Sequence, residues 1–335
     1  MRQVDSIGRT LGDSDDDLLI VTSSFERERS VAASRRLSQY GARCTVLITS
    51  GGDSSSRGER QKKGSVLELL ELLAKVDAGG FPRQILTTGF DPVDLIRQIN
   101  DELRGRSITP NGLVVTLDIS CLTKLQLVTL LRFFIGKRVA SRLRLIYTYP
   151  EAYNTGGWER VGRLTLEYSR PLIFPIQGAF LEDRRVRRRM AIVVVGHEGP
   201  RTLAAWRYAG ADDTWLIEAW SKRRQVMDIC RGENRFLYES VLNFGEPSKV
   251  ISVPNTGLVD TCRTMQRALD GALSDQGVTE VSVVPFGPKP VLAGLCLALL
   301  SRPRMSAELV YSICKRYNAE YSTGVEGVYS EEIVV

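Results

Sequence analysis

The chain has 335 residues, of which 43% are hydrophobic and 25% charged, as expected for a globular protein that buries a core. Six scattered cysteines without a C-x-x-C pair and a single histidine, His197, argue against a zinc cluster and exclude sites that need two histidines. The net charge of +6 permits an anionic partner. No apolar stretch is long enough to cross a membrane and the N-terminus is polar and acidic, so we expect a cytoplasmic protein without membrane contact.

Strands and helices alternate through the first half of the chain. After a polar tail over 1–17, apolar runs predict buried strands and amphipathic runs predict helices. The glycine- and serine-rich stretch 50–63 predicts a mobile loop. The predicted strands are 18–21, 44–49, 84–88, 113–117 and 143–149, and the predicted helices end near 40, 75, 104 and 135. This alternation is typical of a mostly parallel sheet.

Residues 151–182 interrupt the alternation. A strand over 164–168 and an irregular edge segment over 171–180 predict a hairpin and linker. The linker ends in the basic run Arg184–Arg189. Such a run is either a solvated linker or a contact for an acidic partner or nucleic acid, and the first interpretation is favoured.

The second half repeats the alternation. Its predicted strands are 191–195, 213–217, 249–253, 281–285 and 307–312, with helical regions at 202–208, 223–242, 257–273 and about 290–301. The end of the chain, 321–335, resembles the hairpin that follows the first half. We therefore predict two domains, 1–182 and 183–335.

The two halves also share individual residues at a nearly constant spacing. Lys124 and Lys289, each between a buried strand and an apolar helix, are 165 residues apart. The other matched pairs, 164 to 172 residues apart, are Glu26 with Glu198, Arg29 with Arg201, Asp94 with Asp260, Tyr147 with Tyr311, and Tyr153 with Tyr317. We predict an α/β fold of two related Rossmann-like lobes, an internal duplication with mostly parallel sheets and a small hairpin insertion after each lobe.

Polar residues follow the predicted strands and should gather at the carboxyl edge of each sheet, where open α/β folds bind ligands. Lysine and arginine suit a phosphate, hydroxyl groups orient a ligand, and tyrosines stack on a base. Lys124 and Lys289 should lie at helix N-termini, which favour anions. Each Glu-x-x-Arg pair is also explained by a local ion pair. The candidate ligand-binding residues are Ser23, Ser24, Glu26, Arg29, Asp118, Ser120, Thr123, Lys124, Tyr153, His197, Glu198, Arg201, Gly287, Lys289 and Tyr317.

One turn also resembles a known family. The sequence Asp118-Ile119-Ser120-Cys121-Leu122-Thr123-Lys124 is similar to the N-x-T-G-G-T-K turn of CARF domains, the CRISPR-associated Rossmann-fold sensors. Aspartate replaces the asparagine, and Cys121-Leu122 replaces the two glycines. The resemblance implies that the lysine approaches a cyclic oligoadenylate, and that the two halves form a pseudo-dimer within one chain.

Three functional interpretations remain open. The first is a nucleotide-like anion-binding sensor or accessory subunit, for example of a bacterial antiviral defence system. The second is a nucleotide-processing hydrolase, a phosphodiesterase or glycosyl hydrolase, with Glu26, Asp118 or Glu198 as acid or base. The third is a structural subunit that binds a protein partner. Neither a Walker A nor a Gly-x-Gly-x-x-Gly pattern is present, so no cofactor and no catalytic residue can be assigned.

Overall fold

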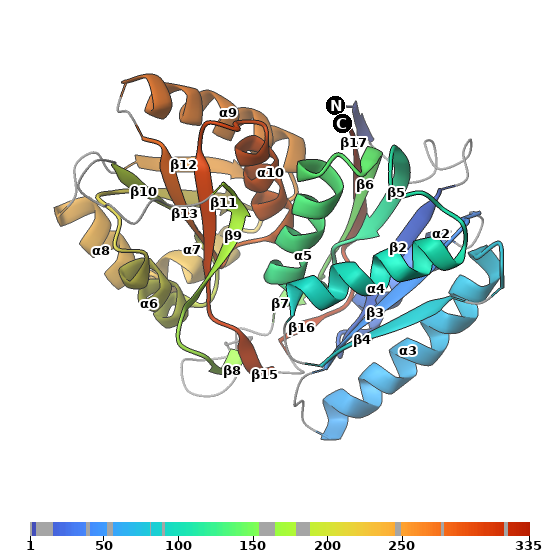
Figure 1. The fold of residues 1–335 in the computed structure, drawn as a ribbon. Coiled ribbons are helices and arrows are strands. Elements are labelled where there is room, and N and C mark those ends of the chain that lie inside the picture. Colours follow the sequence, from blue (N-terminus) through green and yellow to red (C-terminus); the bar gives the residue numbers. More distant parts are fainter. Residues whose placement is uncertain are drawn as a thin grey trace. The chain divides into compact units, whose positions relative to one another are not determined.

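The fold was analysed in a computed structural model (Figure 1), which describes residues 2–4, 16–37, 41–51, 56–80, 82–88, 91–153, 165–178, 188–244, 249–275, 278–317 and 321–335. The chain forms two compact units. Lobe 1 comprises Met1–Glu167 with Lys315–Val335, and lobe 2 comprises Tyr168–Cys314. The predicted domain boundary at 182/183 lies outside the described residues.

Lobe 1 is built on a seven-stranded sheet with the order β1-β17-β6-β5-β2-β3-β4. Its β4, β3, β2, β5 and β6 pair in parallel, whereas β17 pairs antiparallel with β6 and with β1. The strands are β1 (Arg2–Val4), β2 (Leu18–Ser23), β3 (Thr45–Gly51), β4 (Arg83–Thr88), β5 (Leu113–Asp118), β6 (Ala140–Tyr149) and β17 (Gly327–Val334).

The helices of lobe 1 cover both faces of this sheet (Figure 1). Helices α2 and α3 pack on one face, where Leu19, Leu47, Leu69 and Leu73 share a buried apolar cluster; α4 and α5 lie on the other. The helices are α2 (Arg27–Leu37), α3 (Ser56–Val76), α4 (Pro92–Gly105) and α5 (Lys124–Leu131), the last continued by a π-helical turn, η1 (Arg132–Gly136).

Lobe 2 has a six-stranded sheet with the order β12-β11-β10-β13-β14-β9. Neighbouring strands among β12, β11, β10, β13 and β14 pair in parallel, and β9 pairs antiparallel with β14. The strands are β9 (Leu172–Gln177), β10 (Arg189–Val194), β11 (Asp213–Trp220), β12 (Lys249–Pro254), β13 (Glu280–Pro285) and β14 (Ser306–Tyr311).

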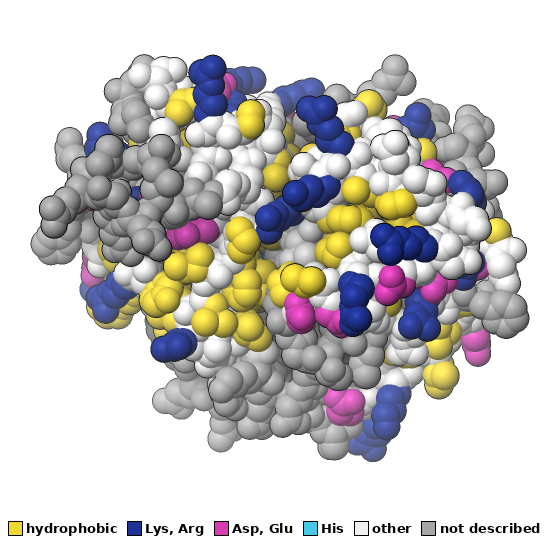
Figure 2. Space-filling view, viewed as in Figure 1, with side chains coloured by type: hydrophobic (Ala, Val, Ile, Leu, Met, Phe, Trp, Pro, Cys, Tyr) yellow, Lys and Arg dark blue, Asp and Glu magenta, His cyan; other side chains and the backbone are white. Residues whose placement is uncertain are grey.

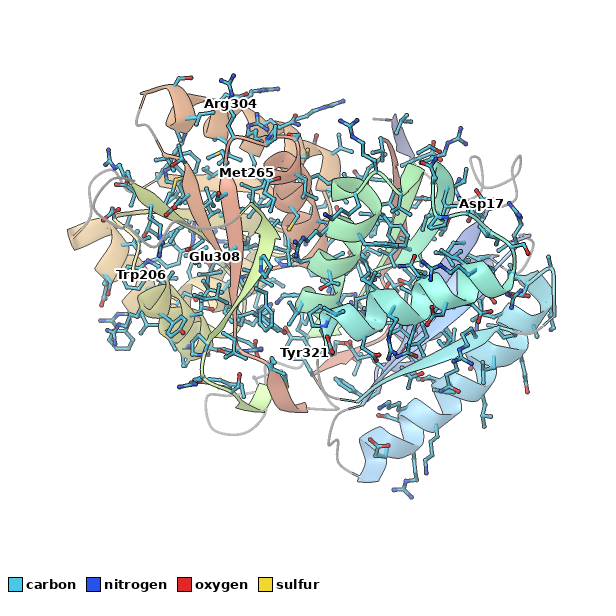
Figure 3. All side chains as sticks on the ribbon, viewed as in Figure 1. Asp17, Trp206, Met265, Arg304, Glu308 and Tyr321 are labelled. Atoms are coloured by element: carbon cyan, nitrogen blue, oxygen red, sulfur yellow. The ribbon has the colours of Figure 1, made fainter. Side chains whose placement is uncertain are left out.

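The helices of lobe 2 also form two layers. Trp206 of α6 donates from its indole to Thr214 of β11 on one side, and Met265 of α9 is buried on the other (Figure 3). The helices are α6 (Gly199–Ala209), α7 (Arg224–Glu233), α8 (Arg235–Phe244), α9 (Leu258–Asp275) and α10 (Lys289–Leu300).

The predicted duplication is confirmed by the topology. The order β4-β3-β2-β5-β6-β17 in lobe 1 matches β12-β11-β10-β13-β14-β9 in lobe 2, with the last strand antiparallel in both. Lys124 and Lys289 are the first residues of the equivalent helices α5 and α10. The predicted pairing of these two lysines is therefore also confirmed.

The segments after the two lobes are exchanged rather than folded back as local hairpins. Strand β9 follows the lobe 1 sheet in sequence but completes the sheet of lobe 2, whereas β17 follows the lobe 2 sheet and completes that of lobe 1. Short strands on the two connections also pair reciprocally, β7 (Ala152–Tyr153) with β16 (Ser322–Thr323) and β8 (Thr165–Tyr168) with β15 (Cys314–Tyr317). The described strands of each connecting segment thus pair with those of the other.

Two local predictions differ from the structure. The predicted mobile loop 50–63 is helical from Ser56 onward, because Glu, Arg, Gln and Lys after the glycines are good helix formers. The single helical region predicted over 223–242 is instead two helices that meet at Asn234. Of the basic run Arg184–Arg189, Arg188 pairs with Asp213 and Arg189 with Glu280; the preceding four residues lie outside the described part of the chain.

Candidate functional site

Most of the predicted site residues lie on, or directly beside, the loops that flank the switch point of each sheet, whereas Tyr153 and Tyr317 lie on the short strands β7 and β15. In lobe 1 the chain runs from β2 outward to β4 and then returns to β5 on the other side of β2. In lobe 2 the chain likewise runs from β10 outward to β12 and then returns to β13 on the other side of β10. The loops after β2 and β5, and after β10 and β13, therefore meet at the place where open α/β sheets hold ligands.

Arg29 connects these loops in lobe 1. Its side chain is only 6% exposed. Its Nη1 donates to Glu26 Oε1 at 2.7 Å, its Nε to the Thr148 carbonyl at 3.1 Å and its Nη2 to the Ser120 carbonyl at 3.2 Å. Burial lowers the pKa of Arg29, but the Glu26 carboxylate together with the neighbouring Tyr147, Cys121 and Tyr153 raises it by more, so the pKa lies above its usual range. Arg29 is a buried cross-link between α2, β5 and β6, with each nitrogen already donating to the protein.

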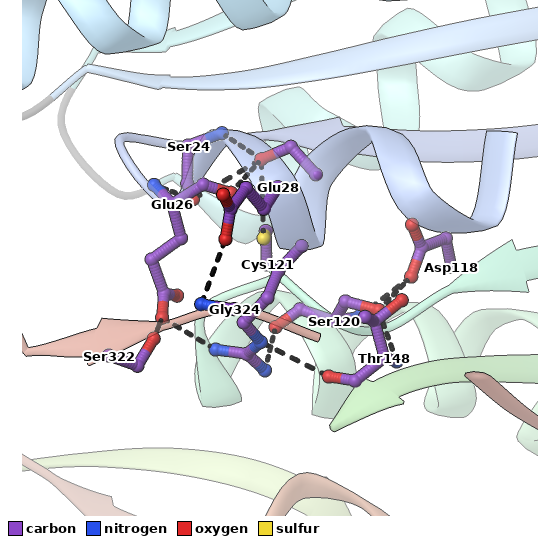
Figure 4. Close-up of polar contacts among 11 residues, drawn as sticks. Ser24, Glu26, Glu28, Asp118, Ser120, Cys121, Thr148, Ser322 and Gly324 are labelled. Carbon is purple, nitrogen blue, oxygen red and sulfur yellow. Dashed lines mark hydrogen bonds and ion pairs between the residues drawn. The ribbon is translucent and has the colours of Figure 1, made fainter. Parts of the chain in front are cut away.

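The turn after β5 is organised by Ser120 (Figure 4). The Asp118 carboxylate accepts from the backbone N–H and the hydroxyl of Ser120, and the Ser120 hydroxyl accepts from the Thr148 N–H at 2.8 Å. Cys121 lies 3.5 Å from the Ser30 hydroxyl. These contacts fold Asp118 and Ser120 inward, so they shape the turn.

The two serines after β2 have local partners as well. Ser23 is buried and donates to Thr49 at 3.3 Å. The Ser24 hydroxyl accepts from the Glu26 N–H at 3.0 Å, and the Ser24 N–H donates to the Ser30 hydroxyl at 3.0 Å. Ser23 therefore links β2 to β3, and Ser24 supports the start of α2.

Lobe 2 repeats the arginine cross-link. Arg201 donates to Glu198 at 2.7 Å and to the carbonyl of Ser312, the equivalent of Thr148. Its guanidinium lies over the rings of Phe286 at 4.8 Å and Tyr311 at 4.9 Å, as that of Arg29 lies over Tyr147 at 5.7 Å. The Glu-x-x-Arg pairs point towards the carboxyl edges as expected, but as buried ion pairs with aromatic neighbours.

His197 lies beside a cysteine that the sequence did not indicate. Cys230 Sγ of α7 is 3.6 Å from Nδ1 and 3.8 Å from Nε2 of His197. Burial raises the pKa of the Cys230 thiol to about 12. At neutral pH the thiol keeps its proton, so the pair does not supply a thiolate nucleophile.

The turns that lead into α5 and α10, here called the lysine turns, end at Lys124 and Lys289. Both lysines are partly exposed. Thr123 and Gln126 form a capping box on α5. The Thr123 N–H donates to Gln126 Oε1 at 2.8 Å, and the Gln126 N–H donates to Thr123 Oγ1 at 3.2 Å. Helix α10 begins after Pro288, whose side chain offers no cap. A Cβ on Gly287 would lie 2.5 Å from Val194 Cγ1, so this glycine allows the turn to pack on β10.

A tyrosine cluster covers the carboxyl edge of lobe 1. Tyr153 packs against Tyr149 at 6.3 Å and Tyr321 at 5.3 Å between ring centroids. Burial raises the pKa of Tyr147 to about 12 and that of Tyr153 well above its usual range. Tyr317 is the last residue of β15, and its side chain is outside the described part of the structure.

The C-terminal segment closes over the same edge. Ser322 donates to Glu26, and the Gly324 N–H donates to Glu28 at 2.8 Å (Figure 4). These contacts join residues 296 positions apart, and no local sequence pattern indicates them. Sequence reasoning missed Ser322, Gly324 and Thr148 for this reason.

Comparison with known proteins finds no family model that matches the chain and no curated protein with a similar sequence. Within the described ranges, no three His, Cys, Asp or Glu residues lie close enough to hold a metal ion. No helix in those ranges is both long and apolar enough to cross a membrane. On the face drawn in Figure 2, the coloured Lys and Arg side chains are scattered among acidic and uncharged ones.

Proposed function

We propose that the chain is a sensor or accessory subunit that binds a nucleotide-like anion at the carboxyl edges of its lobes. The observation that carries this proposal is the pair of lysines, Lys124 and Lys289, at equivalent helix starts beside the two switch points. Both side chains are half-exposed, and an ammonium at a helix N-terminus favours a phosphate.

The internal contacts favour binding over catalysis. Glu26 and Glu198, the acid or base candidates of a hydrolase, each form an ion pair with a buried arginine. Asp118 accepts two bonds from Ser120. Such carboxylates are committed to structure, whereas a general acid or base must reach the substrate proton.

The resemblance of the Asp118–Lys124 turn to CARF domains gives the first ligands to test. Thermal-shift measurements with cyclic oligoadenylates, dinucleotides and mononucleotides should identify one that raises the melting temperature. Chromatography of the incubated ligand then separates a sensor, which leaves it intact, from a hydrolase. A cytoplasmic role in antiviral defence would follow from recognition of a cyclic oligoadenylate.

Lysine substitutions test the location of the site. Lys124→Ala or Lys289→Ala should weaken the ligand by about ten- to a hundredfold, since a charge-assisted hydrogen bond contributes about 1.5–3 kcal/mol. We expect the larger loss at Lys289, because α10 has no side-chain cap competing for its first N–H groups. Lys137, exposed where the α5–η1 helical segment ends, is the matched control, and Lys137→Ala should bind normally. Unchanged affinity in both lysine variants, with intact melting temperatures, would place the site elsewhere and favour the protein-partner interpretation.

A further inference from the structure

The two lobes differ in the helices that connect β3 to β4 in lobe 1 and β11 to β12 in lobe 2. Lobe 1 covers this region with one uninterrupted helix, α3, whereas lobe 2 uses α7 and α8, which meet at Asn234. The break is held in place by the loop after β10. Asn234 Nδ2 donates to the carbonyl of Gly196 at 2.6 Å and to that of Cys230 at 2.7 Å. A Cβ on Gly199 would lie 1.7 Å from the Glu233 carbonyl oxygen, so α6 contacts the end of α7 directly.

This broken helix leaves a hollow beside β12, the edge strand of the lobe 2 sheet. Its volume is about 500 Å³, within the range of small-molecule sites. Leu242 and Val250 are 53% and 43% exposed there. The lining residues are Glu218, Arg231, Gly232, Arg235, Tyr238, Glu239, Leu242 and Val250. These residues belong to β11, β12, α7 and α8, and none of the described lining residues is part of a predicted lysine site.

One end of the hollow is a fixed polar group. Glu218 of β11 is only 6% exposed. Its carboxylate accepts from Nε and Nη2 of Arg231, both at 2.9 Å, and from the Tyr238 hydroxyl at 2.6 Å. The hydrogen bonds from Arg231 lower the pKa of Glu218, whereas burial and then the Glu218 carboxylate raise that of Tyr238. The carboxylate stays ionised and the phenol keeps its proton.

Arg231 keeps a second binding edge after this pairing. A guanidinium has five N–H donors, and the pair with Glu218 uses one on Nε and one on Nη2. Among the described residues, Arg231 donates only to Glu218. The fork formed by Nη1 and the second N–H of Nη2 therefore has no protein acceptor there, and it has the geometry that carboxylates and phosphates bind in a bidentate manner.

We propose that this hollow binds a small amphipathic anion, a carboxylate or phosphate ester with an apolar group. The anion pairs with the open fork of Arg231, and the apolar group covers Leu242 and Val250. The charges that line the hollow balance, with Arg231 and Arg235 against Glu218 and Glu239. A balanced rim does not attract a polyanion such as nucleic acid, so a small anion is the better fit. This site is independent of the proposed lysine site.

The test uses octanoate, hexyl phosphate and the neutral 1-octanol as probes in calorimetric titrations of the full chain. We expect wild type to bind at least one of the two anions about tenfold or more tightly than 1-octanol. The tighter of the two anions identifies the headgroup. The double substitution Arg231→Gln with Glu218→Gln removes the fork without leaving a buried carboxylate unpaired. It should reduce anion binding to the level of the alcohol.

Three further variants complete the design. Arg231→Lys keeps the charge but loses the fork, so its anion affinity should fall between those of wild type and the double variant. Val250→Ser should weaken anions and alcohol alike. Arg35, which makes a similar bond to Glu68 on lobe 1, is the control, and Arg35→Gln should bind as wild type does. If the double variant does not fold, Arg231→Lys and Val250→Ser decide the question. The proposal is overturned if wild type binds neither anion, if the alcohol binds as tightly, or if folded variants lose no affinity.

Discussion

Replacing Arg201 by methionine should destabilise lobe 2 strongly. Arg201 is 3% exposed and donates to Glu198 and to the carbonyl of Ser312. Methionine fills much of the same volume but leaves the buried Glu198 carboxylate without its cation. Breaking a buried pair in this way typically costs about 3–5 kcal/mol.

The contrast with an exposed pair makes this prediction sharp. Arg235 and Glu239 in the same lobe form a 2.7 Å pair whose side chains are 74% and 46% exposed. Such a pair contributes only about 0.3–0.5 kcal/mol, so Arg235→Met should be nearly silent.

Urea unfolding followed by tryptophan fluorescence is the assay, because three of the four tryptophans, Trp206, Trp215 and Trp220, lie in lobe 2. With an m value of about 2 kcal/mol/M, the transition midpoint of Arg201→Met should fall by about 2 M. Adding Glu198→Gln should restore part of the loss, because no charge is then left unpaired. Equal midpoints for Arg201→Met and Arg235→Met would refute the assignment of Arg201 as a buried cross-link.

Three other outcomes test the fold. Burial raises the pKa of Asp16 from 3.8 to about 6. Between these pH values the folded state keeps a proton that the unfolded state has lost, so the free energy of unfolding should fall by at most about 3 kcal/mol as pH rises. Asp16→Asn should flatten this part of the pH–stability curve. Gly294→Ala should lower the stability of the fold, because its Cβ would lie 2.4 Å from the Leu258 carbonyl oxygen. By contrast, a Cβ at Gly232 meets no atom within 4 Å, so Gly232→Ala should stabilise the protein by about 0.5–1 kcal/mol in thermal unfolding. Deleting 327–335 removes β17 and exposes the edge of β6, so hydrogen exchange should accelerate in β5 and β6 but not in β10 and β13.

The repeated core of the fold could be predicted because its signals are local. Buried parallel strands such as β5 and β13 are continuous apolar runs, and each is followed by a short polar turn and a helix. The spacing between Lys124 and Lys289 was sufficient to align the lobes. The burial of the Glu-x-x-Arg pairs was harder to predict. Asp94 and Arg97 also place an acidic residue three positions before an arginine, yet they form an exposed pair.

The strand exchange and the hollow depend on contacts that no local pattern encodes. An antiparallel strand such as β9 or β17 can be added to any open sheet edge of suitable length, and its own residues do not say which. The break at Asn234 depends on the loop after β10, where Gly196 lies 38 residues earlier in the chain. Periodicity therefore predicted one helix there, since both pieces carry compatible amphipathic patterns.

The two lobes share a buried arginine arrangement but differ in the break between α7 and α8. In both lobes a buried arginine lies beside a tyrosine at the sheet edge and donates to a backbone carbonyl, that of Thr148 in β6 or that of Ser312 just after β14. Because this arrangement satisfies buried backbone groups in each lobe, removing it should destabilise either one. The break between α7 and α8 occurs in lobe 2 alone, and α3 shows that the same topology closes without it. The fold therefore does not need this break, which lies beside the exposed apolar side chains of Leu242 and Val250. The amphipathic anion proposed for the hollow would cover these two side chains.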